Sequence, residues 1–408
     1  MMKIKLRKNL IYLLIYFICT FVLYNVIGFF IDKIFEFDSV YICIFLSPIG
    51  NIIGGLIVFL YQKYSLRKRE KIKYFGIKLI HNKKNIAQDR KLKIILLIFF
   101  AAFFNYYNFI LNSIFSIVWE PGLTPWSMAL RLSGIQIIIS TLIYIYAFGF
   151  IIKKHHKISL IIIGIFMFLS ISTDMIFMVL YTYHNNLYKY LGVVISKYFL
   201  TLYYYIGFSF GDCIEKYLVD YNYMNPFIIL MLEGVFQLIM ASLSIIKVDP
   251  FKPFENIKKL NNKALFIFLF ILYTLLQVLV NIYRIYCNVI YSPMARSLID
   301  YLLNPLIIIY SFCILNDFYH ITAYFIIAEI ICIVMSFFGC VFNEYIIIYC
   351  GGLELETKDE IADRADSQLE NELDIIDDIS IYSENDENDV KMNGSNINKS
   401  FDNNGLGI

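Results

Sequence analysis

The sequence is poor in charged residues, which make up only 17% of its 408 positions, whereas 59% are hydrophobic. An average soluble domain has about 25% charged residues and at most half apolar ones. A soluble fold of this length has too little interior to bury so much apolar surface. The composition therefore excludes a soluble enzyme and a nucleic-acid-binding protein, and it predicts a polytopic membrane protein.

Motifs that would indicate a redox, metal or catalytic site are also missing. The eight cysteines include no Cys-x-x-Cys pair, so we expect them to be small apolar packing residues rather than disulfides or metal ligands. The five histidines form no recognisable catalytic arrangement with Ser, Cys or carboxylate residues. His155 and His156 lie in a basic connection, where the sequence predicts a solvated turn. We therefore predict no enzymatic activity, no cofactor and no metal.

Signatures of pumps and channels are equally absent. The chain has no Walker A loop, through which nucleotide hydrolysis could drive transport. It has neither an Arg-rich voltage-sensor repeat nor a Thr-Val-Gly-Tyr-Gly filter. These absences leave a secondary transporter or a non-transporting membrane protein.

Long apolar segments dominate what is present. A helix needs about 20 apolar residues to cross the hydrocarbon, and ten segments qualify. They are residues 9–31, 39–61, 92–115, 127–152, 158–180, 191–213, 225–247, 264–288, 293–315 and 321–350. We expect ten transmembrane helices within a domain that comprises residues 1–352.

Charge is distributed unevenly along the chain. Lys and Arg are concentrated in alternate connections, above all in residues 63–91, so the positive-inside rule places both termini in the cytosol. Residues 353–408 are rich in Asp, Glu, Asn and Ser and contain few aromatics. Such a segment cannot bury enough apolar area to fold, and we predict a disordered acidic cytosolic tail.

Polar residues interrupt several segments at helical spacing. Asn105, Asn108 and Asn112 share one face of the third segment. One face of the eighth carries Thr274, Gln277, Asn281, Arg284 and Asn288. In the ninth, Arg296 and Asp300 can form an i,i+4 pair. Charged groups at membrane depth usually face a cavity or a partner, although such stripes also form hydrogen bonds between packed helices. Together they predict a central polar cavity.

The two halves of the chain resemble each other weakly. Ser127-x3-Arg131 opens the fourth segment and Ser292-x3-Arg296 opens the ninth. Because the two positions are five spans apart, the second copy must be inverted in the membrane. Inverted repeats with a binding site at their interface are common in secondary transporters. We predict two five-helix repeats, at about residues 9–180 and 191–350.

Two stretches resemble a known family. Gly211-Asp-Cys-Ile-Glu-Lys-Tyr-Leu218, followed by Asn225-Pro226 and Leu232-Glu-Gly-Val-Phe-Gln237, resembles the sixth-to-seventh helix region of the drug/metabolite transporter superfamily. The likeness is strongest to the F-type members of solute carrier family 35, a nucleotide-sugar-transporter-like group in which a cytosolic E-K-x-L turn precedes a Pro and an E-G-x-F/Q helix. Ser292-Pro-Met-Ala-Arg-Ser-Leu-Ile-Asp300 resembles the ninth helix of this group.

This resemblance implies ten helices in two inverted five-helix repeats around a central cavity. It also implies a homodimer through the peripheral fifth and tenth helices, and a Golgi-like endomembrane rather than the plasma membrane. Members of the family carry polar solutes such as nucleotide-sugars, but the F-type group has no single substrate class. The substrate therefore does not follow from the resemblance.

The favoured hypothesis is a secondary transporter of a polar, anionic small solute that works by alternating access. Arg suits an anion because it binds phosphate or carboxylate bidentately, and Glu233 is the candidate for proton coupling. The residues predicted to bind substrate or gate its path are Arg131, Arg296, Asp300, Arg284, Asn281, Gln277, Asn105 and Asn108. One alternative is a non-transporting scaffold or adaptor that uses the acidic tail. Another, disfavoured by the missing catalytic residues, is an integral-membrane enzyme acting on lipids.

Overall fold

The computed structural model describes residues 11–27, 39–65, 91–118, 132, 134–184, 191–244, 262–310, 322–349 and single positions between 352 and 361. The chain divides into two compact units, one formed by Lys3–Ile348 and the other by Met1–Met2 with Tyr349–Ile408. The helices discussed below belong to the first unit, and the predicted tail lies almost entirely outside the described residues. Within the described part the protein is helical and contains no strand.

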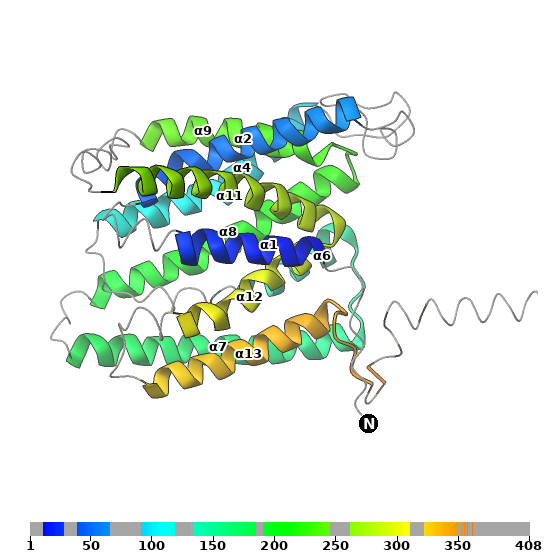
Figure 1. Cartoon of the computed structure of the whole chain (residues 1–408). Coiled ribbons are helices and arrows are strands. Elements are labelled where there is room, and N and C mark those ends of the chain that lie inside the picture. Colours follow the sequence, from blue (N-terminus) through cyan, green and yellow to red (C-terminus); the bar gives the residue numbers. More distant parts are fainter. Residues whose placement is uncertain are drawn as a thin grey trace, which may run out of the picture. The chain divides into compact units, whose positions relative to one another are not determined.

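The helices follow the apolar segments of the sequence. In chain order they are α1 (Ile11–Phe21) with the π-helical η1 (Val22–Ile27), α2 (Ser39–Ser65), α4 (Lys91–Val118), α6 (Gly134–Phe148), α7 (Lys154–His184), α8 (Leu191–Asp220), α9 (Pro226–Ser244), α11 (Lys263–Ile290), α12 (Pro293–Tyr310) and α13 (Thr322–Phe342) (Figure 1). Each α-helix overlaps one of the ten predicted segments, so the prediction of helices there is confirmed. Pro226 and Pro293 open α9 and α12, where the missing N–H is harmless.

Four of the described helices are long and apolar enough to cross a membrane, which is compatible with an all-α membrane protein. The qualifying stretches are Ile44–Tyr64, Lys154–Leu180, Pro226–Leu243 and Lys263–Ile290. The cysteines that the structure describes are free thiols: Cys19, Cys213, Cys287, Cys332 and Cys340.

Aromatic and polar contacts show which helix ends lie together. Tyr12 at the start of α1 stacks on Tyr286 near the end of α11, with 5.6 Å between ring centroids. Tyr286 in turn contacts Phe227 at the start of α9. Asn225, which precedes α9, donates a 3.0 Å hydrogen bond to Gln62 near the end of α2. The starts of α1 and α9 therefore lie beside the ends of α2 and α11.

The remaining helices join the same end. Lys93 at the start of α4 lies over the ring of Tyr217 near the end of α8, and Phe148 at the end of α6 packs edge-on against Tyr217. At the start of α7, His156 contacts Phe342, the last residue of α13. Lys216 of α8 donates a hydrogen bond to the carbonyl of residue 289 in α11, which ties these ends to the first group.

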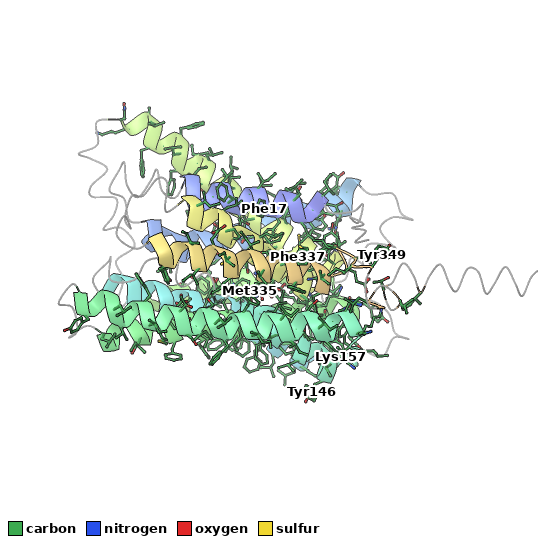
Figure 2. The ribbon with its side chains drawn as sticks, turned by 90° about the horizontal axis from the view of Figure 1, so that it is seen from below. Phe17, Tyr146, Lys157, Met335, Phe337 and Tyr349 are labelled. Atoms are coloured by element: carbon green, nitrogen blue, oxygen red, sulfur yellow. The ribbon has the colours of Figure 1, made fainter. Side chains whose placement is uncertain are left out.

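The start of α12 belongs to this end as well, because it follows α11 after a two-residue turn. Successive α-helices of the described part therefore alternate in direction, and α1 begins at the end where α13 finishes. We call this the basic end, because its described cations are Lys63, Lys91, Lys93, Lys153, Lys154, Lys157 and Lys216. Figure 2 shows Lys157 at the end of α7 that contributes to it.

Helix packing joins segments from the two halves of the chain. The most extensive contacts are made by α2 with α9, α4 with α8 and α7 with α13, and smaller ones join α1 to α11, α2 to α11 and α4 to α9.

Between α2 and α9 the backbones approach closely. A Cβ at Gly55 would stand 2.6 Å from the carbonyl oxygen of Phe227, and one at Gly234 would stand 2.8 Å from that of Pro48. Glycine at both positions is therefore a condition of this contact.

Replacing Gly55 with alanine should push α2 away from α9. Overpacking of this kind costs about 1–3 kcal/mol, so we expect the Gly55→Ala protein to unfold at a lower temperature in detergent. Gly164 of α7 is the matched control, because a Cβ there meets nothing within 4 Å. Gly164→Ala should be neutral or slightly stabilising, since alanine is the better helix former. Equal melting temperatures for the two variants would contradict the close approach of α2 and α9.

Candidate functional site

The helices α8, α9, α11 and α12 bring six charged side chains together inside the protein. We call them the ion network: Asp212 and Glu215 of α8, Glu233 of α9, Arg284 of α11, and Arg296 and Asp300 of α12. All are at most 7% exposed except Asp300, whose side chain is 21% exposed.

The length of α8 places two of these groups. The resemblance to the family predicted that Glu215 lies in a turn after a span that ends at residue 213, but α8 continues to Asp220. That part of the prediction is wrong. Asp212 and Glu215 are three residues apart within one helix, so they share a face. This face is turned toward α11.

Arg284 is the centre of the network. Its Nη1 lies 2.6 Å from Oε1 of Glu215 and 3.2 Å from Oδ1 of Asp212, and its Nη2 lies 3.3 Å from Oε2 of Glu233. One guanidinium group thus joins α11 to both α8 and α9. Arginine suits this role because its planar group presents five donors and stays charged when buried.

Arg296 is the second cation of the network. Its Nη1 lies 2.5 Å from Oδ2 of Asp212, and its Nη2 lies 3.0 Å from Oδ2 of Asp300, the i,i+4 pair that the sequence predicts. The guanidinium also lies over the ring of Phe208, 4.4 Å from the centroid. Asp212 is therefore shared between two arginines and links α8 to α11 and α12.

Two asparagines complete the shell around Glu215. Asn288 lies one turn after Arg284. Its Nδ2 donates a 2.8 Å hydrogen bond to Oε2 of Glu215 and a 2.9 Å hydrogen bond to the backbone carbonyl of Asp212. Nδ2 of Asn105 on α4 donates a 2.9 Å hydrogen bond to Oε1 of Glu215. Asn105 brings the first half of the chain into contact with the network, which otherwise belongs to the second half.

The charges of the network do not balance. Four carboxyl groups face two guanidinium groups, so full ionisation would leave two uncompensated negative charges in a buried site. Desolvation costs several kcal/mol per ion, and an unpaired buried charge is avoided. The site is therefore built to hold a proton or another cation.

Most of the predicted site residues converge here, but not all. Arg284, Arg296, Asp300, Glu233 and Asn105 meet in or beside the network. Asn281 and Gln277 are buried on the same face of α11, but they point toward α2, where Nδ2 of Asn281 donates 3.3 Å to the carbonyl of Ser47. Arg131 lies outside the described residues, as does the side chain of Asn108.

Asp212, Glu215 and Asn288 were missing from the predicted set. Asn288 belongs to the predicted polar stripe of the eighth segment, although it is not among the predicted site residues. For Asp212 and Glu215 the available signal is their spacing of one helical turn.

Another buried acid lies in α7. Asp174 is fully buried and accepts hydrogen bonds from the hydroxyls of Tyr198 on α8 and Tyr324 on α13, at 3.1 and 3.0 Å. The carboxyl group therefore joins three helices.

Arg284→Gln should strongly destabilise the protein, because it leaves the carboxyl groups of Asp212, Glu215 and Glu233 without their shared cation. Breaking a buried ion pair costs about 3–5 kcal/mol. Adding Glu215→Gln removes part of the uncompensated charge, so the double variant should be more stable than the sum of the single effects predicts, by about 0.5–3 kcal/mol. Denaturant unfolding in detergent measures all three variants. Strict additivity would show that Arg284 and Glu215 do not interact.

Comparison with known proteins does not identify the chain. No protein-family model matches the sequence, and no curated protein is significantly similar to it. The resemblance to the drug/metabolite transporter superfamily therefore stays a prediction, and the function has to be inferred from the residues of the chain itself.

Proposed function

We propose that the chain is a secondary transporter that moves a polar small solute by alternating access, with the ion network as its coupling site. The observation that carries this proposal is the burial of six mutually paired charged groups on four packed helices, of which α9 and α11 are long and apolar enough to span a membrane. Ionisable groups at membrane depth are expensive and usually belong to ion or substrate pathways. A purely structural role would be met at less cost by apolar packing.

The packing of the helices supports two related five-helix halves. If each of α1, α2, α4, α6 and α7 corresponds to the helix five places later, a two-fold relation requires that contacts occur in matching pairs. The contact of α4 with α8 then matches that of α11 with α1, and the contact of α2 with α11 matches that of α9 with α4. The helices α2, α6 and α7 each touch their own counterpart.

The directions of the helices support an inverted relation between the halves. Because directions alternate and the shift is five, corresponding helices run in opposite senses: α1 begins at the basic end, whereas α8 finishes there. Ten spans in this arrangement fit the construction of many secondary transporters.

The position of the network suggests how access alternates. Arg284 lies six residues before the end of α11, about 9 Å at 1.5 Å per residue, and Arg296 lies in the first turn of α12. The ion pairs therefore hold α8, α9, α11 and α12 together toward the basic end. We propose that intact pairs close this end and that their rearrangement opens it. Asp300 is the most exposed member of the network.

The charge of the network suggests the coupling ion and limits the solute. Both arginines are already paired with carboxylates, so an anionic solute has to displace a carboxylate to reach a guanidinium. A proton on Asp212 or Asp300 would release Arg296 for the solute, and a proton on Glu233 would release Arg284. We therefore propose that proton binding and anion binding occur together at this site.

The orientation and assembly of the chain remain proposals. The cations of the basic end favour the cytosol by the positive-inside rule, which places the start of α1 and the end of α13 on the cytosolic side. Exposed apolar side chains cover the outer faces of α7 and α13, among them Ile161, Phe168, Ile330 and Ile333. These faces suit lipid and also the predicted homodimer. The Golgi-like membrane is still a prediction.

The transport hypothesis is tested with the full chain in proteoliposomes. A thermal-shift screen against nucleotides, nucleotide-sugars and small anions first selects a solute that stabilises the protein. Its uptake should accelerate under an inward proton gradient. Glu233→Gln should abolish that acceleration but retain binding, because only the proton site is lost. Arg296→Ala should reduce solute binding and uptake at least tenfold, about 1.4 kcal/mol.

Asp220→Asn is the control for the transport experiment, because this carboxylate is 42% exposed and lies outside the network in the same helix as Asp212. Its uptake should equal that of the unmodified chain. Wild-type uptake in both Arg296→Ala and Asp300→Ala would remove the network from the transport site.

The proposed orientation is tested separately in sealed cellular membrane vesicles of known sidedness. A cysteine introduced at Lys63, at the end of α2, and another at Lys157, at the start of α7, should both react with an impermeant reagent only from the cytosolic face. A cysteine at Lys263, at the start of α11 and the opposite end, should react only from the other face. Labelling of positions 63 and 157 from different faces would contradict the alternation of the helices.

A further inference from the structure

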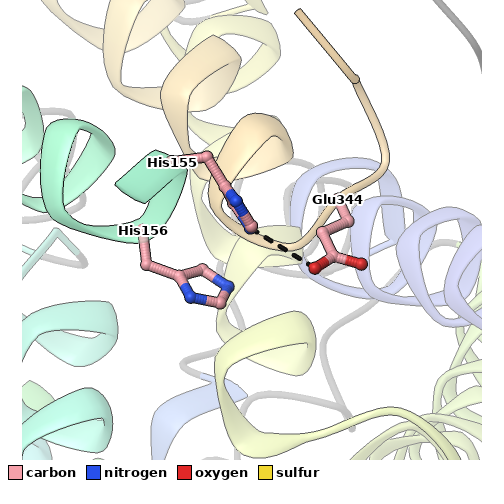
Figure 3. Close-up of side chains that lie close together, drawn as sticks. All are labelled: His155, His156 and Glu344. Carbon is pink, nitrogen blue, oxygen red and sulfur yellow. Dashed lines mark ion pairs between the residues drawn. The ribbon is translucent and has the colours of Figure 1, made fainter. Parts of the chain in front are cut away.

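A second polar cluster lies at the basic end, where α7 begins and α13 ends. The predicted solvated turn at His155 and His156 is wrong, because the two side chains are only 3% and 5% exposed. The chain folds back through Gly149, at φ +64°, so that the first turn of α7 is covered by Phe150 and by Phe342 of α13. Glu344, 7% exposed, follows α13 and faces the histidines (Figure 3).

The geometry between His155 and Glu344 is that of two ligands on one ion. Nε2 of His155 lies 3.3 Å from Oε1 of Glu344. A direct N–H···O hydrogen bond is usually nearer 2.9 Å. Metal–ligand bonds of about 2.0–2.2 Å on a tetrahedral Zn²⁺ place neighbouring ligand atoms about 3.4 Å apart. The observed separation therefore suits a shared metal ion better than a direct bond.

The hydrogen bonding of His155 supports this interpretation. Within the described part of the chain, neither ring nitrogen of His155 meets the criteria for a hydrogen bond. Most buried polar side-chain atoms in proteins have a partner, so an imidazole with none requires an explanation. A metal ion at Nε2 supplies the missing partner.

His156 provides a third ligand next to the first two. Its ring centroid lies 4.0 Å from that of His155, and one ligand atom from each of His155, His156 and Glu344 lies within 4.8 Å of the others. Nδ1 of His156 accepts a 3.2 Å hydrogen bond from the backbone N–H of Lys153, so this nitrogen carries no proton. Coordination through Nδ1 would replace a hydrogen bond worth about 1 kcal/mol.

Lys153 is the cation that now faces the cluster. Its Nζ lies 3.6 Å from Oε1 of Glu344, and its side chain is 21% exposed. It can therefore turn toward solvent when a metal ion takes its place. In the absence of the ion it compensates the carboxylate, which explains how the cluster stays buried.

We propose that His155, His156 and Glu344 bind a divalent transition-metal ion, best matched by Zn²⁺, which joins the start of α7 to the end of α13. Two imidazoles and one carboxylate are a ligand set that zinc uses, and imidazole is a favourable ligand for zinc. Three protein ligands leave a fourth position for water. The ion would fasten the last helices of the two halves to each other at the basic end. This inference does not depend on the transport proposal.

The site is tested by titrating the chelator-stripped full chain in detergent with Zn²⁺. Calorimetry, with elemental analysis of the protein after gel filtration, should give one ion per chain. Loss of a group that merely orients a ligand lowers metal affinity 10–100-fold. We expect His155→Gln and Glu344→Gln, which each remove a ligand, to lower it by at least as much. Zn²⁺ should raise the melting temperature of the unmodified chain but not that of these variants.

Two further variants separate a built site from adventitious binding. His184→Gln changes a histidine at the opposite end of α7 and should leave zinc binding unchanged. Lys153→Met removes the competing cation, so its affinity should equal or exceed that of the unmodified chain. All variants are compared first without metal, by gel filtration and melting temperature, to confirm that they fold. Binding of less than one ion per chain, or zinc affinities in His155→Gln and Glu344→Gln equal to that of the unmodified chain, would overturn the proposal.

Discussion

The arrangement of four helices depends on the rule that a buried charge must be compensated nearby. Arg284 on α11 and Arg296 on α12 cannot be buried without carboxylates, and these carboxylates come from α8, α9 and α12. The register of α8 against α11 and α12 is consequently fixed by Asp212, which both arginines share. Sliding any of these helices by one turn would separate a pair and leave a charge exposed to a medium of low polarity, at a cost of several kcal/mol. Apolar packing alone tolerates such shifts more readily.

The same low polarity makes the ion pairs of the network sensitive to the number of bound protons or other cations. Because four carboxyl groups surround two guanidinium groups, the state of lowest energy depends on how many protons or cations are bound. Protonation of one carboxylate weakens its ion pair with an arginine. It therefore also changes the electrostatic interaction of that arginine with its other carboxylates. A network that was neutral when fully ionised would have no such dependence and would act only as a fixed support. The excess of carboxyl groups over guanidinium groups is thus the feature that would make the ion pairs depend on bound protons or cations.

Local properties of the sequence predict the helices but not all of their contacts. Apolar length is local, so each of the ten predicted segments overlaps a described helix. Arg284, Arg296 and Asp300 were predictable because they interrupt apolar runs at helical spacing. Glu215 was assigned to a turn because a motif resemblance took precedence over the continuing helix. The partnership of His155 with Glu344 has no local signal, since the two residues lie at opposite ends of a long stretch of sequence and meet only when α7 packs on α13.

The charged and neutral sides of the site come from different halves of the chain. Every member of the ion network lies in α8, α9, α11 or α12. The first half contributes a group without formal charge, Asn105, which donates a hydrogen bond to Glu215. If the halves move relative to each other, the strong ion pairs within the second half can persist while the weaker contacts to the first half exchange. A solute entering between the halves would then replace neutral partners first and reach the arginines only after a carboxylate has been released.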